Sequence, residues 1–143
     1  MKLRTLTYLP IFCVLTLSSC SGSGTTEDGV ENEAETLYPE GKKVYDKSCI
    51  ACHQEDGNGI PGSFPPLAKS DYMLEDVDRA IEQVLCGSQG EMVVNGEVYN
   101  NIMPPQNLSD TEVRDVMNYV LNSWGNDGGE VSLKDVTSAK HPD

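Results

Sequence analysis

The sequence predicts a small all-α domain of three to four helices joined by long irregular loops. Two segments carry apolar residues at helical spacing, one from Asp76 to Cys86 and one from Ser109 to Trp124. One short β-prone hairpin lies between them. With 143 residues, of which 38% are hydrophobic and only 6% aromatic, the chain can build one domain with a modest core. Such a composition fits a domain that folds around a large apolar cofactor.

Residues 1–19 are predicted to be a lipoprotein signal peptide. Two basic residues precede an apolar run over residues 8–17 that is too short to span a membrane as a helix. The run closes on Leu-Ser-Ser-Cys, which resembles the lipobox of bacterial lipoproteins, where cleavage leaves Cys20 as the lipidated first residue. The alternative is a hydrophobic stretch that ends in this tetrad by chance. We therefore expect an exported protein, anchored by lipid on Cys20 to a bacterial membrane and facing the periplasm or the cell exterior.

The chain that follows the signal is strongly acidic. Two of the 10 basic residues and none of the 23 acidic residues lie in the signal, so the mature chain has a formal charge of −15. This charge excludes nucleic acid as a partner and favours partners with a basic docking patch, although solubility alone explains part of it. Residues 20–38 contain no basic residue and are predicted to form a flexible, lipidated tether.

The domain itself is predicted over residues 39–126. Its first helix should begin near Pro39, because proline suits the first helical turn. The segment after His53 is rich in glycine and proline and is expected to be irregular. A second helix is expected up to Cys86, ended by Gly87, with an apolar stripe formed by Val77, Ala80, Ile81, Val84 and Leu85.

The second half of the domain is predicted to contain a hairpin and a long helix. Asn95-Gly96 lies between two β-prone segments over residues 92–99, which is a strong hairpin signal. Ser109 and Glu112 form a capping-box pattern at the start of the last helix. The stripe of that helix, expected to end at Gly125, contains Val113, Val116, Met117, Val120, Leu121 and Trp124. Residues 127–143 are expected to be a surface strap or a frayed tail.

The motif that carries chemistry is Cys49-Ile50-Ala51-Cys52-His53, the attachment signature of a c-type haem. At this spacing the two thiols reach both vinyl groups, and the adjacent imidazole meets the iron. The alternatives are a chance pentapeptide or a thiol-redox pair of the thioredoxin type, which an exported chain without a βαβ pattern disfavours. The sequence therefore predicts one covalently bound haem c, with His53 as an iron ligand.

Met103 is the candidate for the second axial ligand. It lies in a non-helical, proline-containing stretch just before the last helix, and a thioether suits haem iron and raises its reduction potential. Met117 lies on an apolar helical stripe and Met73 in a short connecting segment, whereas Met92 is harder to exclude. The second histidine, His141, lies in a polar tail and is expected to be solvated.

The remaining cysteines have other expected roles. Cys13 leaves with the signal and Cys20 takes lipid, so Cys86 has no partner. Free cysteine is among the most buried residue types, so we expect Cys86 to be a small buried hydrophobe. An intermolecular disulfide is the alternative.

From about Leu37 to Trp124 the chain resembles a class I cytochrome c. The resemblance rests on the haem motif and on Gly41 and Tyr45, which precede that motif at the family's spacing. It implies the class I cytochrome c fold: three to four helices around one covalently bound haem, with the small hairpin in the methionine-side loop. It also implies that Gly41 and Tyr45 cross the last helix near Val116 and Tyr119.

Two further residues take their expected roles from this resemblance. Pro65, twelve residues after His53, matches the proline whose carbonyl accepts a hydrogen bond from the ligand imidazole. Leu67 matches a leucine that packs on the haem. The stretch from Gly90 to Asn126 further resembles cytochrome domains fused to copper nitrite reductases or associated with periplasmic dehydrogenases.

The expected function is therefore one-electron transfer between respiratory or periplasmic redox partners, without catalysis by the chain itself. The first alternative is an electron-transfer subunit of a larger reductase, dehydrogenase or oxidase complex. The second is a ligand-binding haem sensor or a peroxidase, in which the methionine would leave the iron. A di-haem peroxidase would need a second attachment motif, which this sequence does not contain, and convincing distal acid–base residues.

Overall fold

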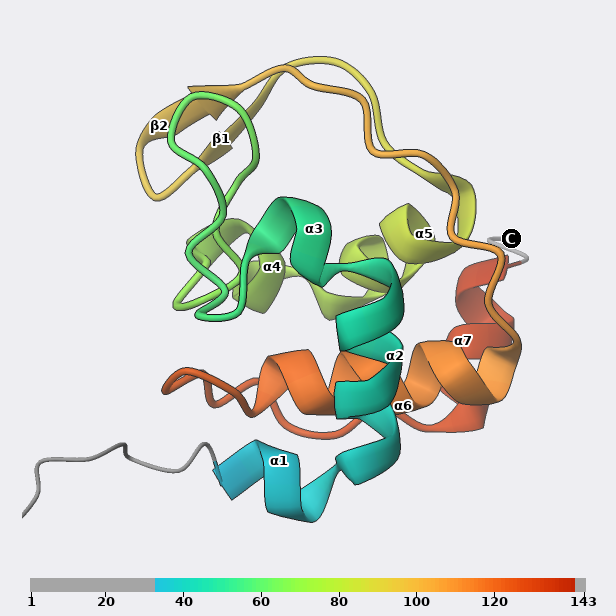
Figure 1. Cartoon of the computed structure of the whole chain (residues 1–143). Helices are drawn as coiled ribbons and strands as arrows, with labels where there is room; N and C mark the ends of the chain where they lie inside the picture. Colours follow the sequence, from blue (N-terminus) through green and yellow to red (C-terminus); the bar gives the residue numbers. More distant parts are fainter. Residues whose placement is uncertain (1–32, 141–143) are drawn as a thin grey trace, which may run out of the picture.

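The computed structural model describes residues 33–140, which form seven helices and one two-stranded sheet (Figure 1). In chain order the elements are α1 Glu33–Leu37, α2 Pro39–Ser48, α3 Ile50–His53, α4 Asp71–Glu75, α5 Val77–Cys86, β1 Met92–Val94, β2 Glu97–Tyr99, α6 Asp110–Leu121 and α7 Leu133–Lys140. This arrangement confirms the all-α prediction with its small hairpin. The predicted signal peptide, Cys20 and His141 lie outside the described residues.

Helix α2 lies across α6 and fixes the position of the haem motif, which follows it in α3 (Figure 1). At the crossing, a Cβ atom on Gly41 would overlap the Asp115 carbonyl oxygen and lie 2.7 Å from the Tyr119 Cβ. Only glycine allows the two backbones to approach so closely. The ring of Tyr45 packs on that of Tyr119 with centroids 5.5 Å apart. The helix crossing predicted at Gly41 and Tyr45 is therefore confirmed.

Helix α5 and the hairpin form where the sequence predicts them. Asp76 caps α5 by accepting a hydrogen bond from the Arg79 N–H at 2.9 Å, and Gly87, with a φ of 79°, ends the helix. In the hairpin, Val93 pairs with Val98 across the strands. Asn95 and Gly96 have φ values of 50° and 81°, the conformation that a two-residue hairpin turn requires.

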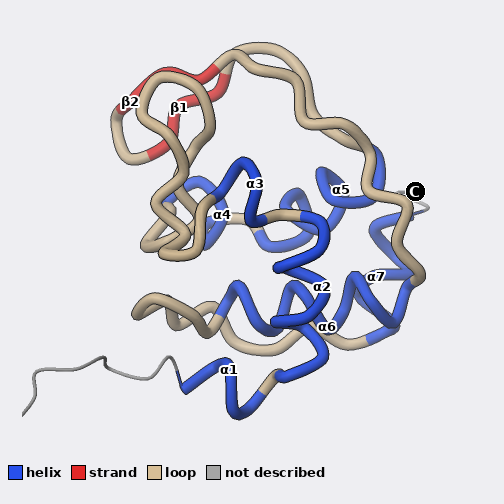
Figure 2. The backbone as a smooth tube through the Cα atoms, in the orientation of Figure 1, coloured by secondary structure: helices blue, strands red, loops and turns tan. Residues whose placement is uncertain are grey.

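The hairpin is joined to the helices by two loops that run side by side (Figure 2). One loop leads from α5 to β1 and the other from β2 to α6. They are linked by an antiparallel bridge between Ser88 and Met103, in which the two distances from backbone nitrogen to carbonyl oxygen are 2.9 and 3.0 Å. The Gln106 N–H also donates to the Val84 carbonyl at 2.9 Å, so the second loop is tied to the end of α5.

Helix α6 begins as predicted but ends earlier. Ser109 and Glu112 form the predicted capping box. The helix stops at Leu121, however, and Trp124 lies in a turn with a φ of 54° instead of on the helix. At this end the Ser123 hydroxyl donates to the Tyr119 carbonyl at 2.6 Å. A side chain thus competes with backbone N–H groups for a carbonyl of the last helical turn.

Both ends of the domain extend beyond the predicted bounds. The prediction that all of residues 20–38 form a flexible tether is wrong for α1, where Ala34 is only 1% exposed. Of the two alternatives predicted for residues 127–143, a surface strap or a frayed tail, the frayed tail is wrong for α7, because α7 packs against α5 and α6 with Val136 fully buried. Few apolar residues mark these segments, so their sequences read as polar surface. Between residues 33 and 140, no helix combines the length and apolar character needed to cross a membrane.

The prediction that Cys86 is buried is wrong as well. Cys86 is the last residue of α5 and is exposed. It follows Val77 by nine residues, which places it half a turn away from the apolar stripe of the helix. Its position on the helix, and not its residue type, decides its exposure.

Candidate functional site

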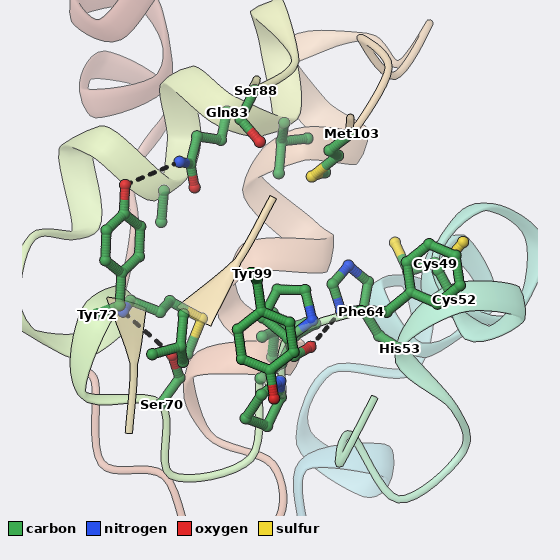
Figure 3. A pocket seen from close by; sticks show the side chains of 18 of the residues that line it. Cys49, Cys52, His53, Phe64, Ser70, Tyr72, Gln83, Ser88, Tyr99 and Met103 are labelled. Carbon is green, nitrogen blue, oxygen red and sulfur yellow. Dashed lines mark hydrogen bonds between the residues drawn. The ribbon is translucent and has the colours of Figure 1, made fainter. Parts of the chain in front are cut away.

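A cavity of about 290 Å³ lies between α3, α5, α6, the hairpin and the two loops that carry Pro65 and Met103 (Figure 3). Most of its lining is apolar and includes Leu67, Val84, Val94, Val116, Met117 and Val120. The six residues predicted to hold haem all line this cavity: Cys49, Cys52, His53, Pro65, Leu67 and Met103. The fold thus brings together residues that lie more than fifty positions apart in the sequence.

The imidazole of His53 is buried, with 9% of the residue exposed, at the end of α3. Its Nδ1 lies 3.0 Å from the Pro65 carbonyl oxygen, as the resemblance implied. A carbonyl can only accept, so Nδ1 carries the proton and Nε2 has a free lone pair. Within the described residues Nε2 has no hydrogen-bond partner, and Figure 3 shows it directed into the cavity.

The electrostatics of His53 favour its metal-binding form. Burial lowers the pKa of the imidazole, and the hydrogen bond to Pro65 offsets only part of that effect. A lowered pKa keeps the ring neutral at physiological pH, and a neutral imidazole is the form that ligates a metal. Nε2 of His53 could therefore ligate a metal ion.

The two thiols of Cys49 and Cys52 are half-buried at the same wall of the cavity (Figure 3). Burial, with a smaller contribution from Cys52, raises the pKa of the Cys49 thiol to about 11. Reactive thiols of the thioredoxin type have a lowered pKa, so this environment argues against a thiol-redox pair.

The loop that presents the Pro65 carbonyl is held close to the haem motif by backbone hydrogen bonds. The Gly59 N–H donates to the His53 carbonyl at 3.0 Å, and the Leu67 N–H donates to the Gly57 carbonyl at 2.7 Å. Gly59 has a φ of 63°, and a Cβ atom there would overlap the Phe64 carbonyl oxygen. A glycine is therefore required where this loop folds back on itself.

Met103 reaches the cavity from the opposite wall. The bridge to Ser88 fixes its backbone, and Gly87 packs so closely that a Cβ atom there would lie 2.6 Å from the Met103 carbonyl oxygen. In Figure 3 the Met103 sulfur and the free ring nitrogen of His53 face each other across the cavity. Both atoms are therefore placed where they could ligate a metal ion held between them.

The competing methionines also line the cavity, but from regular elements. Met73 lies in α4 and Met117 in α6, and both are buried in the core. Met92 is half-buried at the start of β1. Of these methionines, Met103 alone belongs to an irregular loop, where the backbone is free to aim a side chain at the histidine.

Several polar residues of the cavity were not identified from the sequence. The Gln83 amide donates to the Tyr72 hydroxyl at 3.1 Å on the wall opposite the thiols (Figure 3). The Asn101 amide donates to the Ser63 carbonyl at 2.9 Å and so joins the methionine-side loop to the histidine-side loop. Isolated polar residues in loops or beside a helical stripe carry no sequence signal that predicts these contacts.

The comparison with known proteins agrees with this site. The sequence profile of the cytochrome c family matches residues 38–124. Cytochrome c-552 of Thermus thermophilus is 38% identical over 91 residues, covering 60% of this chain and 69% of that protein. The cytochrome c subunit of the quinone alcohol dehydrogenase of Gluconobacter oxydans is 31% identical over 111 residues, covering 67% of this chain. The cytochrome c subunit of the gluconate 2-dehydrogenase of Pantoea cypripedii is 35% identical over 106 residues, covering 70% of this chain.

An apolar cavity lined by two neighbouring thiols, a buried histidine and a methionine is typical of proteins that bind haem covalently. The chain belongs to the cytochrome c family. It carries covalently bound haem c and is an electron carrier with redox partners, not a catalyst itself. The chain spans only 21% and 24% of the length of the two dehydrogenase subunits.

Replacing both Cys49 and Cys52 with Ala should abolish covalent attachment of haem, because no thioether bond can then form. Haem-stained denaturing gels of the exported protein measure this directly. Cys86→Ala is the matched control, since Cys86 is exposed and outside the cavity, and it should retain full staining. Undiminished covalent haem in the double variant would show that other residues attach it.

Proposed function

We propose that this chain is a one-electron carrier whose haem c is attached through Cys49 and Cys52 and whose iron is ligated by His53 and Met103. The observation that carries the proposal is the opposed placement of the His53 lone pair and the Met103 sulfur across an apolar cavity. When bound, haem c supplies an iron that alternates between the ferric and ferrous states and so accepts and releases one electron.

The protein residues contribute orientation and exclusion of water. The Pro65 carbonyl holds the proton on His53 Nδ1 and fixes the plane of the ring. The Ser88 bridge fixes the backbone of Met103. The apolar lining keeps water away from both ligands, so the site changes little when its charge changes. These features suit rapid electron transfer through short-lived contacts with partners.

A sensor or peroxidase would need Met103 to leave the iron. The two backbone hydrogen bonds to Ser88 and the close packing against Gly87 oppose a movement of that residue. The similarity to two dehydrogenase subunits favours instead, as the second candidate, an electron-transfer subunit of a larger dehydrogenase complex. Co-purification with a membrane dehydrogenase at fixed stoichiometry would distinguish this candidate from a free carrier.

We further propose the organisation of the remaining chain: a signal peptide over residues 1–19, lipid on Cys20 and an acidic tether to the domain. The supporting observations are the basic, apolar and Leu-Ser-Ser-Cys segments in succession and the acidic composition that follows. Because α1 belongs to the folded domain, the proposed tether is shortened to residues 20–32.

Replacing Met103 with Ala should leave haem covalently attached, lower the reduction potential and open the iron to cyanide and carbon monoxide. The reason is the loss of the thioether, which favours ferrous iron. The sulfur-to-iron charge-transfer band of the ferric spectrum should disappear. Met92→Leu is the matched control and should keep the band. A band that survives in Met103→Ala but is absent from Met92→Leu would assign the ligand to Met92.

Replacing Cys20 with Ser should give a protein without lipid that is not cleaved at residue 20, as intact-mass spectrometry of the membrane and soluble fractions can show. Cys13→Ser is the control. Because Cys13 lies within the proposed signal, this substitution should leave the mature mass unchanged. An unmodified Cys20 on the native protein would contradict the anchor.

The charge of −15 should steer the mature protein towards partners with a basic docking patch. Electron transfer to a small basic redox protein should therefore slow as salt rises, since screening acts over about 8–10 Å near physiological ionic strength. Stopped-flow rates test this, with an uncharged small-molecule reductant as the control that salt should not affect. A rate that stays flat with the basic protein would reject steering.

A further inference from the structure

The side chain of Asn126 lies where the turn after α6 meets the loop that carries Pro65 and Leu67. Asn126 is 8% exposed. Its amide nitrogen donates to the Leu67 carbonyl at 3.1 Å and to the Val120 carbonyl at 2.8 Å, and its oxygen accepts from the Lys69 N–H at 2.6 Å. One side chain therefore ties Leu67 and Lys69 to the end of α6. Both belong to the loop over residues 54–70, here called the proximal loop, which also carries the Pro65 carbonyl.

Backbone conformation gives independent evidence that this contact constrains the loop. Lys69 has a φ of 50°, in the left-handed region that residues with a side chain rarely occupy. Such a conformation persists only where the surroundings fix it. The turn that delivers Asn126 is also left-handed at Trp124 and Gly125, with φ values of 54° and 80°. Both segments joined by this contact therefore contain a non-glycine residue in the left-handed region, Lys69 in one and Trp124 in the other.

The same turn holds a second part of the proximal loop. The indole of Trp124 packs on Gly57, where a Cβ atom would lie 2.5 Å from the ring, and its N–H donates to the Glu55 carbonyl at 3.0 Å. The Gly57 carbonyl in turn accepts from the Leu67 and Ala68 N–H groups. Leu67 is thus held from two directions.

The position of Leu67 is passed on to the Pro65 carbonyl through a stiff segment. Only Pro66 separates the two residues, and each proline ring fixes its own φ. A displacement of Leu67 therefore moves the Pro65 carbonyl relative to His53 Nδ1, which lies 3.0 Å away. The strength of that hydrogen bond controls the basicity of the imidazole and hence its support for ferric iron.

We propose that Asn126 is a positioning residue for the iron: by holding Leu67 and Lys69, it sets the hydrogen bond from His53 to Pro65 and thereby the reduction potential. The inference rests on the proposed function, in which His53 ligates the iron. Loss of the Asn126 contacts weakens this hydrogen bond, makes the imidazole a poorer donor and raises the reduction potential.

The test compares Asn126→Leu with Asn118→Leu in the full haem-loaded protein, since neither change alters charge. Asn118 is equally buried, at 9% exposed, and its side chain exchanges two hydrogen bonds with Val131, away from the proximal loop. Asn126→Leu should raise the reduction potential. It should also speed the solvent exchange of the His53 Nδ1 proton, measured by NMR, by about tenfold, which is the effect of one lost hydrogen bond. Asn118→Leu should lower stability and leave both quantities unchanged.

The proposal is overturned if both variants lose stability while the potential and the proton exchange of Asn126→Leu stay at the values of the unmodified protein. A failure of the proposed function is separate, because it would appear in the unmodified protein as spectra without histidine and methionine ligation. If Asn126→Leu yields no haem-loaded protein, the unmodified protein decides. The Lys69 amide proton and the His53 Nδ1 proton should then lose protection together as denaturant is added, and separate openings would contradict a common constraint.

Discussion

The hydrogen bond from His53 Nδ1 to the Pro65 carbonyl is the interaction on which the site depends. It assigns the proton to one ring nitrogen and leaves the lone pair of the other directed into the cavity. Burial lowers the pKa of the ring and so disfavours a competing protonation. Without this bond the ring could rotate or change tautomer, and the methionine opposite would have no defined partner. The proximal loop therefore has to be placed as accurately as the histidine itself.

The placement of the histidine depends on the crossing of α2 and α6. Gly41 permits the close approach, and the rings of Tyr45, Tyr119 and Trp124 pack pairwise with centroids 5.2 to 5.7 Å apart. The Tyr45 hydroxyl donates to the Gln54 carbonyl at 2.6 Å, directly after the motif. The aromatic cluster thus joins the haem motif, the last helix and the turn that carries Asn126 in one continuous contact.

Local sequence signals predicted much of this structure. The haem motif, the Asn95-Gly96 hairpin and the capping box at Ser109 each depend on residues close together in the chain, and each lies where it was expected. The Pro65 contact and the Gly41 crossing came from family resemblance, because no local pattern encodes a partner far away in the sequence.

The features that were missed depend on tertiary contacts. Helices α1 and α7 are short, largely polar segments, and some of their apolar residues, such as Ala34 and Val136, are buried against the rest of the domain while Leu37 and Leu133 stay exposed. Trp124 fits the helical stripe by spacing, yet the chain leaves the helix before it. The exposure of Cys86 is decided by its position on the helix and not by the tendency of cysteine to be buried. Spacing and residue type are priors, and packing overrides them.

The two axial sides of the cavity are supported unequally. On the histidine side, His53 belongs to helix α3, and the loop that carries Pro65 and Leu67 is held by buried side chains such as Asn126. The methionine side consists of an irregular loop held mainly through backbone bonds to Ser88 and Val84, and its Ile102 is 72% exposed. Local opening requires least free energy where few buried contacts must be broken. The constraint on Met103 is therefore the weaker one, and it depends on the Ser88 bridge and the close contact with Gly87.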